Sequence, residues 1–195
     1  MNNHATKRLT ILSVLTAISF ALTIFPKVAI LPAASFLKID FSIVPAFLAL
    51  TWYGIGSATL LLIVRTLLKV IIFNEGVNTY IGMPMNFLVA WAFLLAYVIV
   101  LALPVIKEQR PVVKQSLALL VAIVFMTLIA IVANIVWGIP LYSSMAHFDI
   151  AKFIGIPQYL WGMVLPFNLI EGLVWAVASL AVVKALSPFK KTFQP

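Results

Sequence analysis

The stretch Phe41–Phe73, FSIVPAFLALTWYGIGSATLLLIVRTLLKVIIF, decides how the rest of this chain is divided. A helix needs about 20 apolar residues to cross about 30 Å of hydrocarbon, so this stretch is long for one span and short for two. Its middle contains Gly54 and Gly56, and glycine marks a break in an otherwise helical pattern. We therefore predict two helices here, at residues 42–53 and 55–73.

The composition is that of an integral membrane protein. Hydrophobic residues make up 64% of the 195 residues and charged residues only 9%, and the mean hydropathy is +1.17. A soluble domain needs far more charge to cover its surface. We expect a single domain over residues 1–195, an all-α membrane protein folded as a compact bundle of six transmembrane helices. The expected spans are residues 9–25, 42–53, 55–73, 80–103, 117–137 and 161–186.

The distribution of positive charge favours six spans and sets their orientation. With the N-terminus in the cytoplasm, six spans leave only Lys27, Lys38 and Lys152 outside. Five spans would carry the basic loop at 107–114 and the basic C-terminal tail across the membrane, against the tendency of basic segments to stay in the cytoplasm. We expect both termini to be cytoplasmic and the protein to lie in the cell (plasma) membrane. The basic residues expected inside are Lys7, Arg8, Lys107, Arg110, Lys114, Lys184, Lys190 and Lys191.

Several kinds of site are disfavoured by the same residues. The chain has no cysteine and two histidines, so disulfides and thiolate metal sites are excluded and a histidine metal site is nearly so. We expect no metal and no cofactor. The net charge of +8 does not indicate nucleic acid, because the basic residues flank apolar runs as membrane anchors do.

Three charged residues interrupt apolar runs. These are Arg65, Lys69 and Glu171, and a charge at membrane depth costs about 2.5–3.5 kcal/mol even on the most lenient scale. Arg65 and Lys69 are four residues apart and project from one helix face. Two interpretations stay open: a solute cavity with a cationic and an anionic wall, or a structural Arg65–Glu171 ion pair with Lys69 reaching to the membrane surface.

Amides and loops add to the cavity hypothesis. Asn86, Asn134 and Asn168 fall in the outer half or near the middle of their predicted spans. An amide both donates and accepts, which suits the edges of a neutral ligand, although it also joins helices to one another. The outside segments 26–40 and 138–159 are either lids over the cavity or ordinary connecting loops.

Two motifs stand out in the chain, Phe36–Ser42 (FLKIDFS), followed by Pro45, and Pro166–Gly172 (PFNLIEG). Together they resemble motifs of the substrate-binding S components of energy-coupling factor (ECF) vitamin importers, and those of the riboflavin type most closely. The resemblance covers most of the chain. It implies an S component that captures a vitamin outside with high affinity and delivers it inward with a membrane T subunit and two cytoplasmic ATPases.

The resemblance also implies where the T subunit binds. Ser13, Ala17 and Ala21 recur every four residues along the first helix, and small residues at this spacing let another helix approach closely. In the ECF family such a face contacts the T subunit. The chain contains no GxxxxGK[ST] motif, so ATP hydrolysis would belong to the partners and the chain would be non-catalytic.

One departure from the riboflavin-type motif affects the choice of vitamin. That motif typically has lysine where this chain has Glu171, and a carboxylate accepts hydrogen bonds instead of donating them. Flavin carbonyls would lose a donor, whereas an aminopyrimidine or pyridinium N–H would gain an acceptor. We therefore expect hydroxymethylpyrimidine or a pyridoxine-like vitamin, with riboflavin or pantothenate as alternatives. The expected substrate-binding residues are Asp40, Arg65, Lys69, Asn86, Asn134, Asn168 and Glu171.

Two functions of other classes are weaker. A membrane-embedded enzyme needs paired carboxylates, or a nucleophile with a base, and Glu171 is the one acid clearly inside a predicted span. A stand-alone carrier is favoured by inverted repeats, and the sequence has none that is convincing.

Overall fold

The computed structural model of this chain describes residues 3–190. The described residues are mostly helical, with one two-stranded antiparallel hairpin. Two π-helical turns, Asn134–Gly138 and Leu160–Val164, lie between α-helices. One 3-10 turn, Pro32–Ala34, lies between the two strands, and another, Ser187–Phe189, follows the last α-helix. The other elements are α1 (Asn3–Leu22), β1 (Lys27–Ala29), β2 (Lys38–Asp40), α2 (Ile43–Tyr53), α3 (Ile55–Ile72), α4 (Val77–Ala102), α5 (Pro104–Lys107), α6 (Pro111–Ala133), α7 (Ile139–Met145), α8 (Ile150–Phe153), α9 (Ile156–Tyr159) and α10 (Leu165–Leu186).

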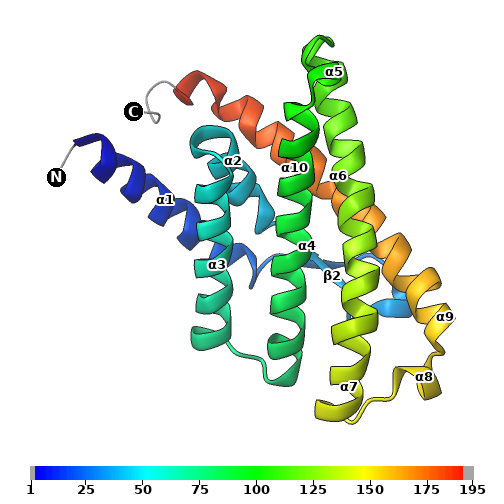
Figure 1. The fold of residues 1–195 in the computed structure, drawn as a ribbon. Coiled ribbons are helices and arrows are strands. Elements are labelled where there is room, and N and C mark those ends of the chain that lie inside the picture. Colours follow the sequence, from blue (N-terminus) through cyan, green and yellow to red (C-terminus); the bar gives the residue numbers. More distant parts are fainter. Residues whose placement is uncertain (1–2, 191–195) are drawn as a thin grey trace.

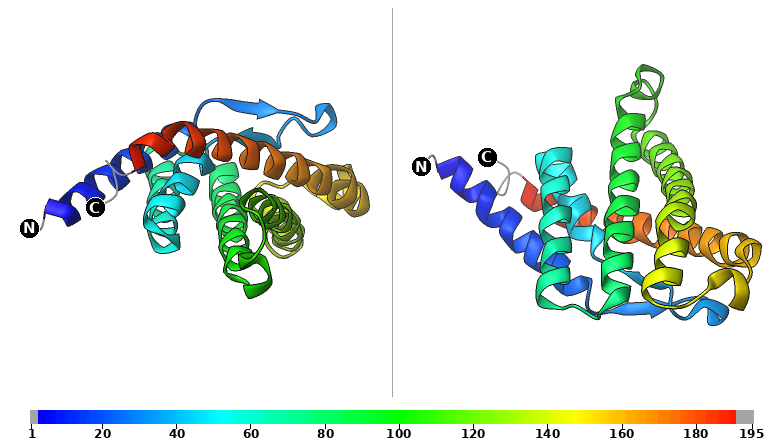
Figure 2. Two further views of the ribbon diagram at one scale, coloured as in Figure 1. Left: turned by 90° about the horizontal axis from the view of Figure 1, so that it is seen from above. Right: turned by 60° about the horizontal axis from the view of Figure 1, so that its bottom comes forward.

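The helices form two layers with α2 between them. Helices α3, α4 and α6 run side by side, while α1, α10 and the hairpin lie behind them (Figures 1 and 2). Helix α2 contacts α1, α3 and α10, and almost all of its residues are buried. Helices α10 and α6 approach closely at Gly172, where an added Cβ would lie 3.1 Å from Ile123. The core therefore runs from α2 to the α6–α10 contact.

Five helical segments are long and apolar enough to cross a membrane. Helix α2 is apolar too but has 11 residues, so it is about 16 Å long and shorter than the hydrocarbon core. The chain is thus a membrane protein with five such segments and one short buried helix among residues 3–190. The five segments are Ala5–Leu22, Ile55–Ile72, Val77–Ala102, Pro111–Met145 and Ile156–Phe189.

The outside segment at residues 26–40, expected to be a lid or a connecting loop, contains the two strands of the hairpin. Lys27 pairs with Asp40, Val28 with Ile39 and Ala29 with Lys38. Each strand has three residues, which is too short to give the alternating pattern by which a strand is recognised. The all-α expectation therefore missed one small sheet.

The segment expected to be a loop at residues 138–159 is largely helical. The helix that begins at Pro111 continues through the first π turn to the end of α7, and α8, α9 and the second π turn lead into α10. Pro140 and Pro166 follow these π turns. A proline has no N–H for the carbonyl four residues before it, which suggests a helix end in sequence, whereas here the turn widens and the helix goes on.

The break between α2 and α3 falls at Gly54, where the sequence predicts it. Gly54 has φ 85° and ψ 175°, a backbone conformation that is essentially restricted to glycine. We expect Gly54→Ala to lower the free energy of unfolding by about 1–3 kcal/mol, the usual strain for a side chain in this region. Thermal unfolding of the detergent-solubilised protein measures this.

Gly56→Ala is the matched control for this prediction. Gly56 lies two residues later inside α3, and an added Cβ would meet nothing within 4 Å at either glycine. In a helix, alanine is favoured over glycine by about 0.5–1 kcal/mol, so Gly56→Ala should be neutral or stabilising. Equal destabilisation by both substitutions would contradict the backbone argument.

Candidate functional site

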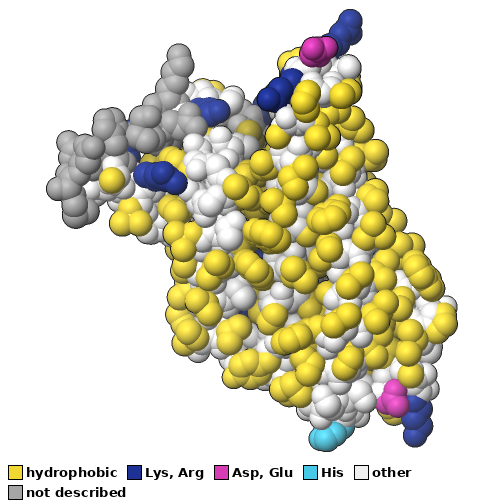
Figure 3. Space-filling model, in the orientation of Figure 1, with side chains coloured by type: hydrophobic (Ala, Val, Ile, Leu, Met, Phe, Trp, Pro, Cys, Tyr) yellow, Lys and Arg dark blue, Asp and Glu magenta, His cyan; other side chains and the backbone are white. Residues whose placement is uncertain are grey.

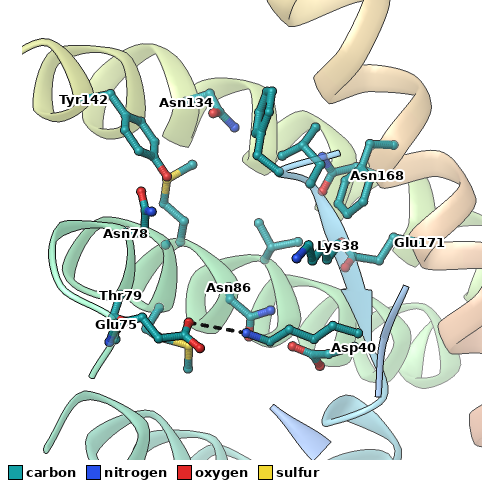
Figure 4. Close-up of a pocket in the computed structure, with 18 of the residues that line it drawn as sticks. Lys38, Asp40, Glu75, Asn78, Thr79, Asn86, Asn134, Tyr142, Asn168 and Glu171 are labelled. Carbon is teal, nitrogen blue, oxygen red and sulfur yellow. Dashed lines mark hydrogen bonds and ion pairs between the residues drawn. The ribbon is translucent and has the colours of Figure 1, made fainter. Parts of the chain in front are cut away.

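A cavity of about 790 Å³ lies between the hairpin, α4, the segment from Asn134 to α9, and α10. Figure 4 shows its labelled side chains projecting from these elements toward a common space. Its wall mixes polar groups with aromatic ones, including Phe36, Phe148 and Trp175. The predicted substrate-binding residues that line it are Asp40, Lys69, Asn86, Asn134, Asn168 and Glu171.

Arg65 does not belong to this lining. It is completely buried, and its guanidinium donates to Ser42 Oγ and, at 2.6 Å, to Asn86 Oδ1. Among residues 3–190 the ion pairs all involve Glu75, so the Arg65–Glu171 ion pair that the sequence left open does not form. Arg65 therefore lies directly behind the cavity wall.

The corner between β2 and α2 is held by a dense set of hydrogen bonds. Ser42 donates to Asp40 Oδ1 from its backbone N at 2.9 Å and from its hydroxyl at 2.5 Å. Trp175 Nε1 donates to the Asp40 carbonyl at 2.9 Å, and Ser19 Oγ donates to the Ser42 carbonyl at 2.6 Å. This corner thus joins α1, α3 and α10 to the hairpin.

Lys69 is buried and paired, so it does not reach to the membrane surface. Its ammonium lies 3.4 Å from Glu75 Oε2 and donates to the Phe73 carbonyl at 2.9 Å. Lys27 of β1 lies 3.6 Å from the same Glu75 oxygen. Sequence reasoning did not propose Glu75, although it is one of only five acidic residues in the chain and that scarcity is a usable signal.

Two of the three predicted asparagines bond back to their own helix. Asn134 Nδ2 donates to the Ala130 carbonyl at 2.8 Å, and its oxygen accepts from Tyr159 at 2.6 Å. Asn168 Nδ2 donates to the Val164 carbonyl at 2.8 Å. The Asn168 oxygen has no hydrogen-bond partner within the described part of the chain, so it is available to a ligand.

Glu171 is the most exceptional group in the cavity. Its side chain is 5% exposed, and no hydrogen bond or ion pair to another described residue engages its carboxylate. A buried polar group without a partner is costly. A carboxylate that lines a cavity gains its partner when a ligand in the cavity donates a hydrogen bond to it. Glu171 and the Asn168 oxygen together give α10 an acceptor surface.

Tyr159 is an aromatic residue of the cavity wall. It is buried, donates to Asn134, and stacks on Phe36 with ring centroids 6.5 Å apart. Phe36 comes from the FLKIDFS motif. The pair brings the hairpin segment against α9 and gives the cavity a flat aromatic element.

The small residues of α1 lie away from this cavity. Ser13, Ala17 and Ala21 are all exposed, with Val14 and Ile18 exposed beside them. The Ser13 hydroxyl donates to the Leu9 carbonyl within the helix at 2.9 Å, so it needs no outside partner. The result is a flat, unpartnered helix face.

Comparison with known proteins agrees with this arrangement. The family model for the substrate-specific component of ECF transporters matches residues 7–183. The chain belongs to this family. An ECF S component is the substrate-binding, non-catalytic part of a membrane transporter, so the enzyme alternative is set aside.

Individual relatives of this S component are riboflavin transporters. RibU of Leuconostoc mesenteroides is 46% identical over 187 residues, which cover 96% of this chain and 94% of the relative. RibU of Streptococcus thermophilus is 39% identical over 175 residues, which cover 89% and 79%. A solved S component of a bacterial ECF transporter has a similar fold, with a TM-score of 0.75 and 28% identity over 95% of this chain and 98% of that one.

Proposed function

We propose that this S component binds riboflavin with high affinity on the outer side of the cell membrane and delivers it inward. The observation that carries the proposal is the 46% identity, over nearly the full length, to a riboflavin transporter. The cavity supports it, because about 790 Å³ is within the usual range for a drug-sized ligand. This alternative replaces hydroxymethylpyrimidine or a pyridoxine-like vitamin as the preferred ligand.

The other vitamins fit the cavity less well. A single pyrimidine or pyridine ring would leave much of the volume empty, whereas the tricyclic ring and ribityl chain of riboflavin would use it. Pantothenate needs a cation for its carboxylate, which Lys38 of the lining would supply, but it has no ring. Phe36 and Tyr159 supply aromatic faces that suit a flat ring system.

We assign the ligand contacts to six of the predicted residues. Glu171 and the Asn168 oxygen would accept from the N–H of the flavin ring or from ribityl hydroxyls. Asn86 and Lys69 would face the ligand from the opposite side, with Asp40 and Asn134 completing the wall. Arg65 would act from behind this wall.

We further propose a single domain over residues 1–195 that crosses the membrane six times with both termini in the cytoplasm. One hydrophobic cluster includes residues of all the long helices, which supports one domain. The start of α1, the α5 end and the end of α10 lie at the same end of the molecule (Figure 1). This placement supports an even number of crossings, in which the short α2 would be the sixth.

Charge supports this orientation. Figure 3 shows apolar side chains over the middle of the molecule and Lys and Arg side chains near the α1 and α5 end. Basic segments favour the cytoplasmic side. Lys191 lies outside the described residues. The basic residues near this end are Lys7, Arg8, Lys107, Arg110, Lys114, Lys184 and Lys190.

We propose that the partners are an ECF T subunit, bound on the small-residue face of α1, and two cytoplasmic ATPases. Family membership supports a role within an ECF transporter. The exposure of Ser13, Ala17 and Ala21 supports the place of contact, because small residues let a second helix pack closely in a membrane.

Titration of riboflavin into the detergent-solubilised protein tests the proposed ligand. Quenching of flavin fluorescence should report saturable binding at nanomolar concentrations. An excess of hydroxymethylpyrimidine, pyridoxine or pantothenate should not displace the flavin. Binding of one of these three in preference to riboflavin would refute the proposal.

Glu171→Gln should weaken riboflavin binding about ten- to a hundredfold, the usual value of a hydrogen bond to a charged group. The ligand-free variant should insert in the membrane and be at least as stable thermally as the parent, because an unpaired buried charge is removed. Glu108→Gln, at an exposed acid on the α5–α6 connection, is the control and should bind normally. Unchanged affinity of Glu171→Gln would remove Glu171 from the site.

Ala17→Trp should prevent assembly with the T subunit and leave riboflavin binding intact, because a bulky ring blocks close helix packing. Pull-down with a tagged T subunit measures assembly. Val124→Trp, at an exposed position on α6, is the matched control and should assemble. Normal recovery of the complex with Ala17→Trp would count against this interface.

A further inference from the structure

We propose that Arg65 is a positioning residue of the binding site. It determines which atoms of Asn86 face the cavity and fixes the corner that carries Asp40, without touching the ligand itself. The inference starts from three observations. Arg65 is fully buried and lies outside the cavity lining. It donates to Asn86, which lines the cavity, and to Ser42, whose hydroxyl donates to the lining residue Asp40. It deepens the proposed function and rests on it.

The chemistry of the guanidinium fixes the orientation of Asn86. Arginine has only hydrogen-bond donors, so the Asn86 oxygen must point toward Arg65, at 2.6 Å. The Asn86 amino group is then turned away from Arg65. Asn86 lines the cavity, and no described residue accepts a hydrogen bond from this amino group. Arg65 thereby gives the α4 wall a hydrogen-bond donor.

The α10 wall has the opposite polarity. The Asn168 amino group donates to the Val164 carbonyl, which leaves the Asn168 oxygen free to accept. When Glu171 is ionised, both of its carboxylate oxygens accept and neither donates. Figure 4 shows Asn86 on one side of the cavity and Asn168 and Glu171 on the other. A ligand with acceptors along one edge and donors along the other is therefore bound in one orientation. Without Arg65 the Asn86 amide is free to turn, and this polarity is lost.

Arg65 also acts on Asp40, by way of the Ser42 hydroxyl. The Ser42 hydroxyl accepts from Arg65 and donates to Asp40 Oδ1, so a hydroxyl between a cation and a carboxylate has both its partners fixed. Asp40 ends β2 and pairs with Lys27 across the hairpin. The same guanidinium thus fixes the end of β2, through Ser42, at a defined position relative to Asn86 on α4.

A double-mutant cycle on riboflavin affinity tests whether Arg65 acts on the ligand through Asn86. Arg65→Met and Asn86→Ala should each weaken binding about tenfold or more, a fold-change typical of one hydrogen bond. Because Arg65 acts largely through Asn86, the double variant should bind much more tightly than the product of the two losses implies. Arg65→Lys should recover part of the affinity, since an ammonium donates to one of the two partners. Losses that multiply, as for independent sites, would overturn the proposal.

Asn86→Asp keeps the test valid if Arg65→Met fails to fold. The carboxylate still accepts from Arg65, so the stability of the ligand-free protein should be maintained, but the cavity loses its donor and riboflavin affinity should fall about tenfold. Unchanged affinity would show that the Asn86 amino group does not meet the ligand. Thr66→Val is the matched control, because the neighbouring Thr66 hydroxyl has no hydrogen-bond partner among residues 3–190, and it should bind like the parent.

A measurement without ligand separates this inference from the proposed function. In the ligand-free protein, Arg65→Lys should raise the amide hydrogen exchange of residues 38–42, and Thr66→Val should not. Unchanged exchange would overturn the role of Arg65 at the hairpin corner. Failure of the parent protein to bind riboflavin would instead refute the proposed vitamin, and it would leave the exchange result to decide on Arg65.

Discussion

The structure depends on how the buried charge of Arg65 is accommodated. A guanidinium inside an apolar bundle needs hydrogen-bond partners. Here its two terminal nitrogens donate to Ser42 and Asn86, while Nε has no partner among the described residues. Ser42 in turn binds Asp40 and, through its carbonyl, Ser19. One buried cation therefore joins α1, the β2–α2 corner, α3 and α4, and it does so directly behind the cavity.

The cavity wall divides its charges into paired and unpaired groups. Glu75 is approached by both Lys27 and Lys69 at the hairpin side, so its charge is largely balanced there. Glu171 has no such cation within 4 Å among the described residues and lies almost fully buried. The groups that are left unpaired in the ligand-free protein are the ones to which a ligand adds most, because pairing a buried polar group removes a desolvation penalty.

The sequence predicted the long helices and six of the residues that line the cavity, but not the contacts that hold them. The break at Gly54 could be predicted because few other residues adopt its backbone conformation. The mid-span charges and amides could be recognised because the membrane makes buried polar groups costly. The hairpin could not be predicted, because a three-residue strand is too short to show an alternation of polar and apolar residues. The partners Ser42 of Arg65 and Glu75 of Lys69 could not be predicted either. Both partners lie outside the helix that carries the two cations, and only the folded chain brings each pair into contact.

Glu171 is compatible with a flavin once the whole cavity is considered. The riboflavin-type motif resembled by PFNLIEG has a lysine at this position, so this chain has a carboxylate instead of a cation at that point of α10. The cavity lining nevertheless includes Lys38 on β2 and Asn86 on α4, which supply donors. A flavin ring presents two carbonyls flanking an N–H, so it needs donors and an acceptor together. Acceptors on α10, together with donors on α4 and β2, meet that need without a lysine at position 171.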